Sequence, residues 1–288
     1  MKNPEIARQL WSELWQDYRQ RVRYARVYQE MIESAGGSIA NDHIAFRSLC
    51  LKIGDRPFGI AYLEPIIESL GYRVGGEYHF PATHLYARHY SHPEQDSLDL
   101  PKLFISELIV SELPAEIASS IESTVLDHPA NTQNLEFVKD YLKIFTRPWS
   151  IPSRSVVEAV NQVSQYGAWV LLHGYSVNHF TGYVNRQNTP VYADIESTAR
   201  GLSDRGVPMK DTVEGDRGTG LRQTATRAIT ETVTVKDDAT GESIEIPWTY
   251  AYYEIAERNA IRLADGREEL FQGFLDAQAK NLFEMTKQ

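Results

Sequence analysis

The amino-acid sequence predicts an α+β fold in which two βαβββ modules form one curved, mixed sheet. The order strand, helix, three strands occurs twice, over residues 41–112 and 175–260. The remaining stretches, 1–37, 113–172 and 261–288, show mainly the apolar spacing of helices. Each module could supply half of a sheet around a shared cavity, so the 288 residues are predicted to form a single domain.

The first half of the chain begins with one or two helices. Apolar side chains such as Leu10 and Leu14 recur near the helical period over residues 4–35, and Gly36 and Gly37 end the region. The first module then consists of a strand, a helix and three strands, at residues 43–51, 58–70, 72–80, 84–90 and 102–110.

The second half repeats this order after the helical linker 113–172. Its module consists of a strand, a helix and three strands, at residues 179–184, 191–205, 207–213, 220–235 and 246–257. Asp237, Asp238 and Gly241 are typical of a turn, and they predict a hairpin between the last two strands. A C-terminal helix is expected over 261–288.

Composition excludes several classes of protein. A hydrophobic content of 42% and a charged content of 24% are typical of a globular chain. The net charge of −10 opposes binding to a phosphate backbone, so a nucleic-acid partner is not expected. No membrane span and no signal peptide are apparent, which favours the cytoplasm. A monomer or a homodimer is expected. The single cysteine, Cys50, excludes an intramolecular disulfide and a cysteine-based metal site.

One histidine stands at the start of the first strand in each module. Side chains alternate between faces along a strand, so His43 shares a face with Ala45 and Arg47, and His179 shares one with Thr181. These faces are small or polar, as the lining of a ligand cavity would be. Matching places in a repeat therefore favour a role as metal ligands over two unrelated structural histidines.

The other histidines are weaker candidates. His173 lies six residues before His179 and is the alternative ligand in the second module. Four more are clustered in the first module, but their spacing matches no standard metal site. They are His79, His84, His89 and His92.

A carboxylate is expected to complete the ligand set, and two glutamates compete for that place. Glu254 lies in the apolar and aromatic run 249–256, where a carboxylate is costly unless it binds a metal or a cation. The structural alternative is an ion pair with Arg47 or Arg258. Glu107 lies in the last strand of the first module and could be equivalent to Glu254.

The number of carboxylates decides the chemistry. Two histidines and one carboxylate leave open positions on one side of an octahedral metal, which suits non-haem Fe(II) and oxygen activation. Two histidines and two glutamates would leave fewer, which suits a redox-neutral lyase or isomerase of the glyoxalase type. A third alternative is a metal-free protein that binds a small molecule.

Two polar side chains, Arg47 and Gln223, are predicted to be catalytic. Both are also predicted to contact the substrate, as are His43 and His179. Arg47 follows His43 by four residues and points the same way, and its guanidinium can hold a carboxylate through two hydrogen bonds. Gln223 lies in a strand that is polar for a place beside a core, so it could bind a substrate or a metal-bound oxygen. A structural role for Arg47 and an exposed place for Gln223 are the alternatives.

At these residues the sequence resembles a family formerly described as a domain of unknown function and now assigned as 2-oxoadipate dioxygenase/decarboxylases. The resemblance is carried by residues 41–48, 100–108 and 178–181, and it extends from about residue 5 to the end. The family belongs to the vicinal oxygen chelate superfamily, whose paired modules match the repeat described above. Residues 252–258 are also similar to the last metal-ligand strand of 4-hydroxyphenylpyruvate dioxygenase.

The resemblance implies a set of roles for individual residues. His43, His179 and Glu254 would hold Fe(II), Arg47 would bind a substrate carboxylate, and Glu107 would lie outside the metal shell. The implied enzyme takes a small 2-oxo acid and O2. It would convert 2-oxoadipate to 2-hydroxyglutarate and carbon dioxide, a reaction of lysine degradation.

Overall fold

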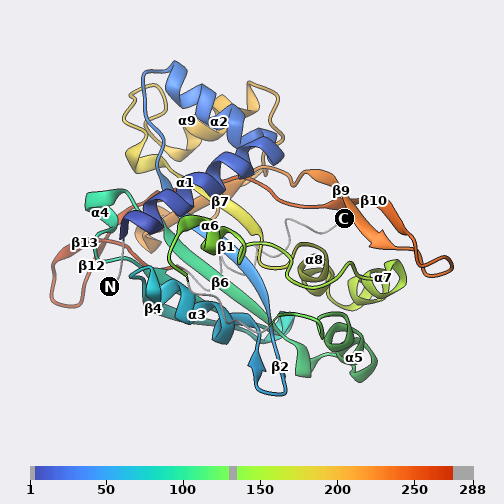
Figure 1. Cartoon of the computed structure of the whole chain (residues 1–288). Helices are drawn as coiled ribbons and strands as arrows, with labels where there is room; N and C mark the ends of the chain where they lie inside the picture. The colour runs from blue at the N-terminus through green and yellow to red at the C-terminus, as the bar shows by residue number, and fades with distance from the viewer. Residues whose placement is uncertain (1–3, 130–134, 275–288) are drawn as a thin grey trace.

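The computed structural model describes residues 4–129 and 135–274 (Figure 1). Its centre is a mixed sheet of seven strands, in the spatial order β4, β5, β6, β1, β7, β11, β8. These strands are β1 (Asn41–Cys50), β4 (Arg73–Phe80), β5 (Leu85–Ser91), β6 (Lys102–Ile109), β7 (Val177–Tyr183), β8 (Leu221–Ala225) and β11 (Glu254–Arg258). Strand β1 pairs with β6 of its own module, in parallel, and with β7 of the second module, in antiparallel. The two modules therefore meet in the middle of the sheet.

The connection between strands repeats in the two halves. In the first module β1 is followed by α3 (Gly59–Ser69) and then by β4, β5 and β6, of which β6 pairs with β1. In the second module β7 is followed by α9 (Ile195–Ser203), and the last strand, β11, pairs with β7. Each half therefore places its last strand beside its first, and the predicted repeat is confirmed.

The predicted strand 207–213 is wrong as a regular strand. This segment lies along β8, but it makes only the isolated bridges Met209–Thr226 and Glu214–Gln223. Pro208 has no backbone N–H to donate, which interrupts a ladder of hydrogen bonds. The segment nevertheless takes the place in the second half that β4 takes in the first.

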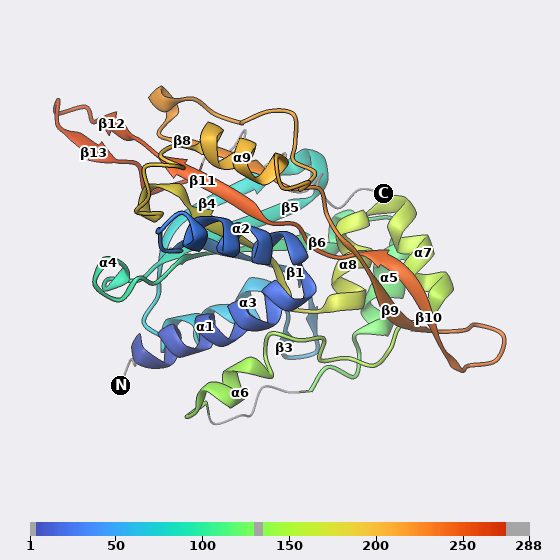
Figure 2. The same cartoon turned by 90° about the horizontal axis from the view of Figure 1, so that it is seen from above.

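The predicted strands 220–235 and 246–257 each divide into two. The breaks fall at 226–229 and 250–253, so β9 (Thr230–Lys236) and β10 (Ser243–Thr249) form a separate hairpin that projects from the sheet (Figures 1 and 2). The predicted turn is confirmed, because the backbone N–H of Gly241 donates to the Asp237 carbonyl at 2.9 Å.

Helices cover the outer face of the sheet. On the outer face, which carries Phe46 and Phe180, Trp11 and Trp15 of α1 (Pro4–Arg21) lie 6.2 and 5.2 Å from these rings. The remaining helices are α2 (Arg23–Ser34), α4 (Gln95–Leu98), α5 (Ala115–Thr124), α6 (Val138–Leu142), α7 (Arg154–Val163) and α8 (Gln165–His173). Helices thus fill much of the linker, as predicted. Within the described residues, none is long and apolar enough to span a membrane.

Short elements complete the connections. A small hairpin follows β1, and 3-10 helices lie between several of the larger elements. They are β2 (Lys52–Ile53), β3 (Arg56–Pro57), η1 (Pro81–Thr83), η2 (Val110–Glu112), η3 (Val184–Arg186) and η4 (Arg217–Thr219).

The predicted C-terminal helix is wrong over 261–274. Here the chain forms the hairpin β12 (Ala260–Arg262) and β13 (Glu268–Leu270), and an irregular segment follows at 271–274. Gly266 has φ of +84°, and the N–H of Leu263 donates to the Arg267 carbonyl at 2.8 Å, which closes a tight turn instead of a helix. Residues 275–288 lie outside the described part of the chain.

Candidate metal centre

Strand register places the three predicted metal ligands on one face of the sheet, here called the inner face. His43 in β1 lies opposite Thr181 in β7, and Ala45 lies opposite His179. Glu254 in β11 also lies opposite Thr181. Directly paired residues in neighbouring strands point to the same side, so His43, His179 and Glu254 share this face.

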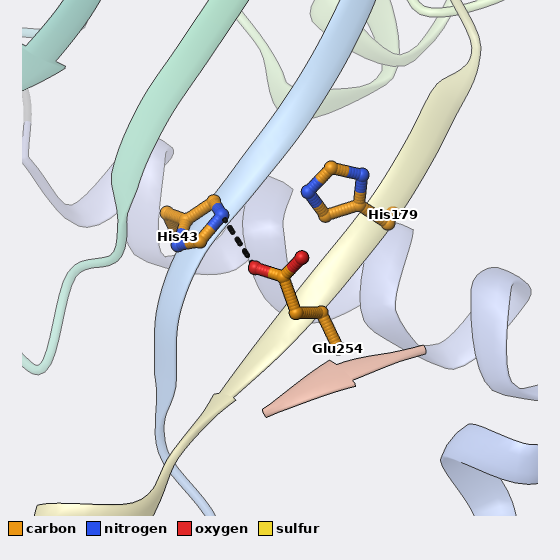
Figure 3. Close-up of side chains that lie close together, drawn as sticks. All are labelled: His43, His179 and Glu254. Atoms are coloured by element: carbon orange, nitrogen blue, oxygen red, sulfur yellow. Dashed lines mark ion pairs between the residues drawn. The ribbon is translucent and has the colours of Figure 1, made fainter. Parts of the chain in front are cut away.

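The three side chains form a compact and buried group, with exposed fractions of 0%, 2% and 2%. One ligand atom from each residue lies within 4.8 Å of the others, and His43 Nε2 is 3.4 Å from Glu254 Oε1. Figure 3 shows all three side chains directed into the same small space. Ligand atoms around a single ion are about 3 Å apart when each bond is near 2.1 Å, so this group requires only small movements to bind one metal.

His179 is prepared to act as a ligand. Its Nδ1 pairs with the Asn178 side-chain oxygen at 3.0 Å, and its buried Nε2 has no hydrogen-bond partner among the described residues. Burial lowers the pKa of His179 well below its usual value, and the charges of His43 and Arg47 lower that pKa further. The ring is therefore neutral, with the Nε2 lone pair available, which is the form that metals bind.

His43 is held from both sides of its ring. Nδ1 lies 2.8 Å from Asp42 Oδ1, and Nε2 lies 3.1 Å from the Thr181 hydroxyl, which also donates to Glu254 at 3.2 Å. Burial acts to lower the pKa of His43, but the hydrogen bonds that the ring donates to Asp42 and Glu254 outweigh burial, so this pKa is raised. A carboxylate behind a histidine is typical of metal sites, because it fixes the ring and increases its basicity.

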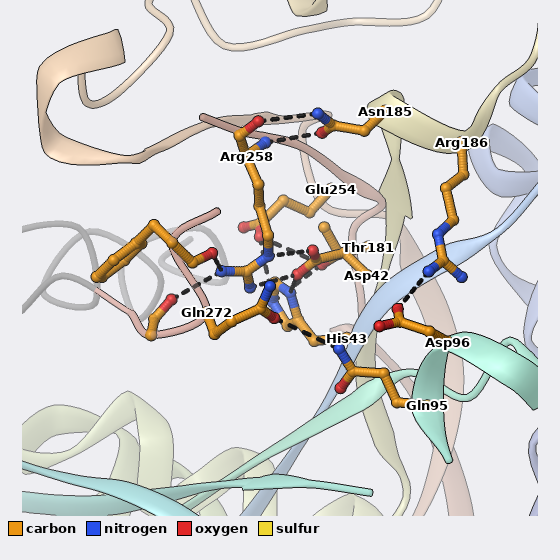
Figure 4. A network of polar contacts seen from close by, with 12 residues as sticks. Asp42, His43, Gln95, Asp96, Thr181, Asn185, Arg186, Glu254, Arg258 and Gln272 are labelled. Carbon is orange, nitrogen blue, oxygen red and sulfur yellow. Dashed lines mark hydrogen bonds and ion pairs between the residues drawn. The ribbon is translucent and has the colours of Figure 1, made fainter. Parts of the chain in front are cut away.

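Asp42 is in turn bound by Arg258 through two hydrogen bonds of 2.5 and 2.8 Å (Figure 4). Arg258 also donates to the carbonyls of Phe271 and Gly273, at 3.0 and 2.9 Å. The suggestion that Arg258 pairs with Glu254 is therefore wrong. The residues that bind Nδ1 of the two histidines have a signal in the sequence, because Asp42 and Asn178 directly precede His43 and His179.

Glu107 lies on the outer face and takes no part in the metal group. It pairs with Ser48, on the opposite side of β1 from His43, and its carboxylate accepts a hydrogen bond from the Ile60 N–H at 2.7 Å. Glu257 makes the matching contact in the second module, with the N–H of Ile195 at 2.9 Å. Glu107 is thus equivalent to Glu257, and its suggested equivalence to Glu254 is wrong.

The structure brings Arg47 and Gln223 to the inner face as well. Arg47 is 2% exposed, and its guanidinium lies 5.0 Å from the Tyr166 ring and 5.2 Å from the Trp169 ring, both on α8. Burial lowers the pKa of Arg47. Gln223 is 2% exposed, so the alternative that it is an exposed strand residue is wrong. It pairs with Ala256, which lies two residues after Glu254 and on the same face.

The competing histidines lie elsewhere. His173 is in α8, where its ring is 4.8 Å from Trp169 and Nδ1 is 3.6 Å from Glu231. His84 pairs with Glu112 at an exposed place, at 2.8 Å. In the part of the chain that the structure describes, the group that could hold a metal consists of His43, His179 and Glu254. Sequence reasoning missed Tyr252, whose ring stacks on His179 at 4.7 Å.

Comparison with known proteins shows the family to which the chain belongs. A model of the 2-oxoadipate dioxygenase/decarboxylase family matches residues 8–287. The chain is 28% identical over 255 residues to the chloroplastic/amyloplastic 2-oxoadipate dioxygenase/decarboxylase of Oryza sativa subsp. japonica. That alignment covers 84% of this chain and 66% of the rice protein, so the chain spans just under two thirds of this relative's length.

Solved structures show the same architecture. Hydroxyglutarate synthase from Oryza sativa, solved with 2-oxoadipate, superposes with a TM-score of 0.80 and 26% identity, over 98% of this chain and 92% of that one. A protein from Ralstonia eutropha JMP134, assigned to the glyoxalase superfamily, shares the fold with a TM-score of 0.79 and 24% identity, over 94% and 86% of the two chains. The predicted curved, mixed sheet of two modules is therefore confirmed. The chain belongs to the 2-oxoadipate dioxygenase/decarboxylase family.

Proposed function

We propose that this protein is an Fe(II)-dependent oxygenase that oxidatively decarboxylates and hydroxylates a 2-oxo acid. The proposed reaction takes 2-oxoadipate and O2 to 2-hydroxyglutarate and carbon dioxide, which balances in carbon, hydrogen and oxygen. The observation that carries the proposal is the buried group of two histidines and one glutamate on the inner face. Family membership supports it, as does the rice relative solved with 2-oxoadipate.

The residues present fit an iron ion, which when bound would supply oxygen activation and a point of chelation for the 2-oxo acid. His179 offers a lone pair that no described residue uses. Nε2 of His43 lies beside Glu254, and it can bind a metal only in its unprotonated form. Thr181 donates to Glu254 at 3.2 Å and so orients the carboxylate.

Arg47 is proposed to bind the distal carboxylate of the substrate. It is a buried cation on the inner face, close to the Tyr166 and Trp169 rings. A guanidinium in such surroundings forms strong, bidentate hydrogen bonds with a carboxylate. This contact would hold the substrate in one orientation, which favours a single product.

Gln223 is proposed to hydrogen-bond the reacting end of the substrate. Its side-chain oxygen is buried and has no partner among the described residues. The Tyr252 ring stacked on His179 and the Phe274 ring 4.8 Å from His43 exclude water from the same space. A dry pocket of this kind protects a reactive site from side reactions.

A second carboxylate at the metal would suit the redox-neutral alternative. Glu107 was the candidate for that ligand, and its contact with the first turn of α3 places it on the outer face. With one carboxylate and two histidines, the group leaves open the positions that a 2-oxo acid and O2 need. The geometry thus favours the oxygenase over a lyase or isomerase.

Oxygen consumption tests the proposal. The protein would be loaded with Fe(II) and ascorbate and supplied with 2-oxo acids of four to eight carbons in an oxygen electrode. We expect the fastest uptake with 2-oxoadipate, no turnover under argon, and both atoms of labelled O2 in the hydroxyglutarate. Turnover without oxygen, or no uptake with any acid by protein that holds stoichiometric iron, would refute the oxygenase.

A further inference from the structure

The internal symmetry of the sheet assigns matching residues in the two modules. His43 on β1 and His179 on β7 are one such pair. Glu107 and Glu257 are another, since each accepts a hydrogen bond from a backbone N–H in the first turn of its module's helix, at 2.7 and 2.9 Å. These two pairs fix the equivalence of the remaining positions.

The same symmetry identifies the counterpart of Glu254. Glu254 precedes Glu257 by three residues in β11, and Phe104 precedes Glu107 by three residues in β6. Strand pairing gives the same result, because Glu254 and Phe104 each lie opposite the residue two positions after their module's histidine. A fully symmetric site would thus have a second carboxylate where this chain has Phe104.

Phe104 belongs to an aromatic cluster that covers the first-module side of the metal group. It is 2% exposed, and its ring lies 5.0 Å from the ring of Phe274. Phe274 lies 4.8 Å from His43 and 5.3 Å from His89, and its N–H donates to the Tyr78 hydroxyl at 3.1 Å. Phe104 and Phe274, here called the aromatic wall, therefore take the space beside His43.

The second-module side has a different character. His179 Nε2 and the Gln223 side-chain oxygen are buried there without hydrogen-bond partners among the described residues. A buried polar atom without a partner is costly, and a bound ligand removes the cost. The two sides of the metal group thus differ: one is closed by rings and the other presents polar atoms to a ligand.

We propose that Phe104 is a specificity-determining residue, because it replaces the fourth protein ligand that the symmetry of the fold would supply. With Phe274 it closes the first-module side of the metal group. The 2-oxo acid is thereby directed to the side of His179 and Gln223, with its distal end toward Arg47. The inference rests on the proposed function and names the residue that leaves room at the metal for the substrate.

The direct test restores the missing ligand. Phe104→Glu is compared with Phe104→Leu, which stays apolar, and Fe(II) binding is measured by calorimetry without oxygen. Loss of a group that only supports a ligand changes metal affinity about 10- to 100-fold, so a new direct ligand should raise it about tenfold or more. Binding of 2-oxoadipate to the iron can be followed by its charge-transfer absorption. Phe104→Glu should need at least about tenfold more 2-oxoadipate than Phe104→Leu to develop this absorption.

A buried glutamate can destabilise the metal-free protein, so thermal unfolding is recorded with and without Fe(II). A ligand that binds the folded state raises its stability, so Fe(II) should raise the unfolding temperature of Phe104→Glu more than that of Phe104→Leu. A second variant, Phe274→Ala, opens the aromatic wall without adding charge. It should keep Fe(II) affinity and gain affinity for 3-methyl-2-oxovalerate, whereas Phe271→Ala in the same segment should not.

Equal Fe(II) affinity in Phe104→Glu and Phe104→Leu, or an unchanged requirement for 2-oxoadipate, would overturn the inference. An equal response of Phe274→Ala and Phe271→Ala would overturn the role of the aromatic wall. None of these measurements needs turnover. A wild-type protein that binds iron and acid but consumes no oxygen would refute the oxygenase and leave the inference to be decided by the affinities.

Discussion

Arg258 binds both carboxylate oxygens of Asp42, although the two residues lie 216 positions apart in the chain. Both side chains are fully buried, with exposed fractions of 0% and 1%. Arg258 holds the pKa of Asp42 well below its usual value, against burial, which acts to raise it. Because Asp42 also binds His43 Nδ1, this pair sets the orientation of a proposed metal ligand.

Removing Arg258 should therefore affect both stability and metal binding. Arg258→Met leaves Asp42 buried without its cation, which costs about 3–5 kcal/mol of unfolding free energy. Fe(II) affinity should fall about 10- to 100-fold, because His43 loses its support. Urea unfolding and calorimetry measure the two effects. The exposed pair of Arg262 and Glu268 supplies the control, Arg262→Met, and an equal loss there would contradict the assignment.

Metal content should separate the two competing glutamates. His179→Ala and Glu254→Ala remove proposed ligands, so the purified proteins should hold little iron by mass spectrometry of the metal. Glu107→Ala should keep its iron and lose about 1–3 kcal/mol of stability, because it removes the carboxylate that accepts the Ile60 N–H. Iron retained by Glu254→Ala and lost by Glu107→Ala would reverse the ligand set.

Arg47→Lys should impair recognition of a dicarboxylic acid. The lysine keeps the charge but loses the bidentate fork, so KM for 2-oxoadipate should rise about tenfold or more with unchanged iron content. The matched control is 2-oxohexanoate, which has the same chain length without the distal carboxylate and should show little change. Equal losses for both acids would mean that Arg47 binds the carboxylate next to the keto group.

His89 should make the stability of the protein depend on pH in the acid range. Burial, together with the charges of Lys102, Arg258 and His43, lowers the pKa of His89 to about 4. The unfolded chain takes up this proton near pH 6.5 and the folded chain does not, so stability rises with pH between about 4 and about 6.5. The total change is about 3 kcal/mol. Urea midpoints for wild type and His89→Gln should converge as the pH falls, and parallel curves would exclude this role.

Lys102 should make the stability of the protein depend on pH in the alkaline range as well. Burial lowers the pKa of Lys102 to about 8, so at neutral pH the folded protein holds a poorly solvated ammonium group. Lys102→Met should therefore stabilise the protein at pH 7 by about 3 kcal/mol. The gain should shrink between about pH 8 and about pH 10.5, where the unfolded chain still binds the proton. Urea unfolding at pH 7 and pH 10 tests this, and a gain that does not change with pH would contradict it.

The regular elements were predictable because local spacing decides them. The stretch 58–70 has the helical period, and the helix runs over Gly59–Ser69. The stretch 246–257 is mostly apolar and aromatic, which predicts one strand. The chain leaves the sheet at 250–253 because tertiary contacts hold it there, among them the Tyr250 hydroxyl bonded to the Val177 carbonyl at 3.0 Å.

The two histidines were predictable because each begins a module. Glu254 and Glu107 were not separable by local sequence, since both lie in apolar strands near the end of a module. The face of each strand decides between them, and register sets the face: a shift of one residue moves every side chain to the other side. Register depends on pairing between distant strands, so only the resemblance to a known family favoured Glu254.

The pairing of Asp42 with Arg258 also has a consequence during synthesis. Strand β1 leaves the ribosome early, but Glu254 and Arg258 belong to β11, which follows by about two hundred residues. Contacts so distant in sequence form late in folding. A nascent chain that has exposed only His43 and His179 lacks the carboxylate ligand and the support of His43. The proposed iron site can therefore be complete only after both modules have joined, which would keep the proposed oxygen chemistry out of the unfinished polypeptide.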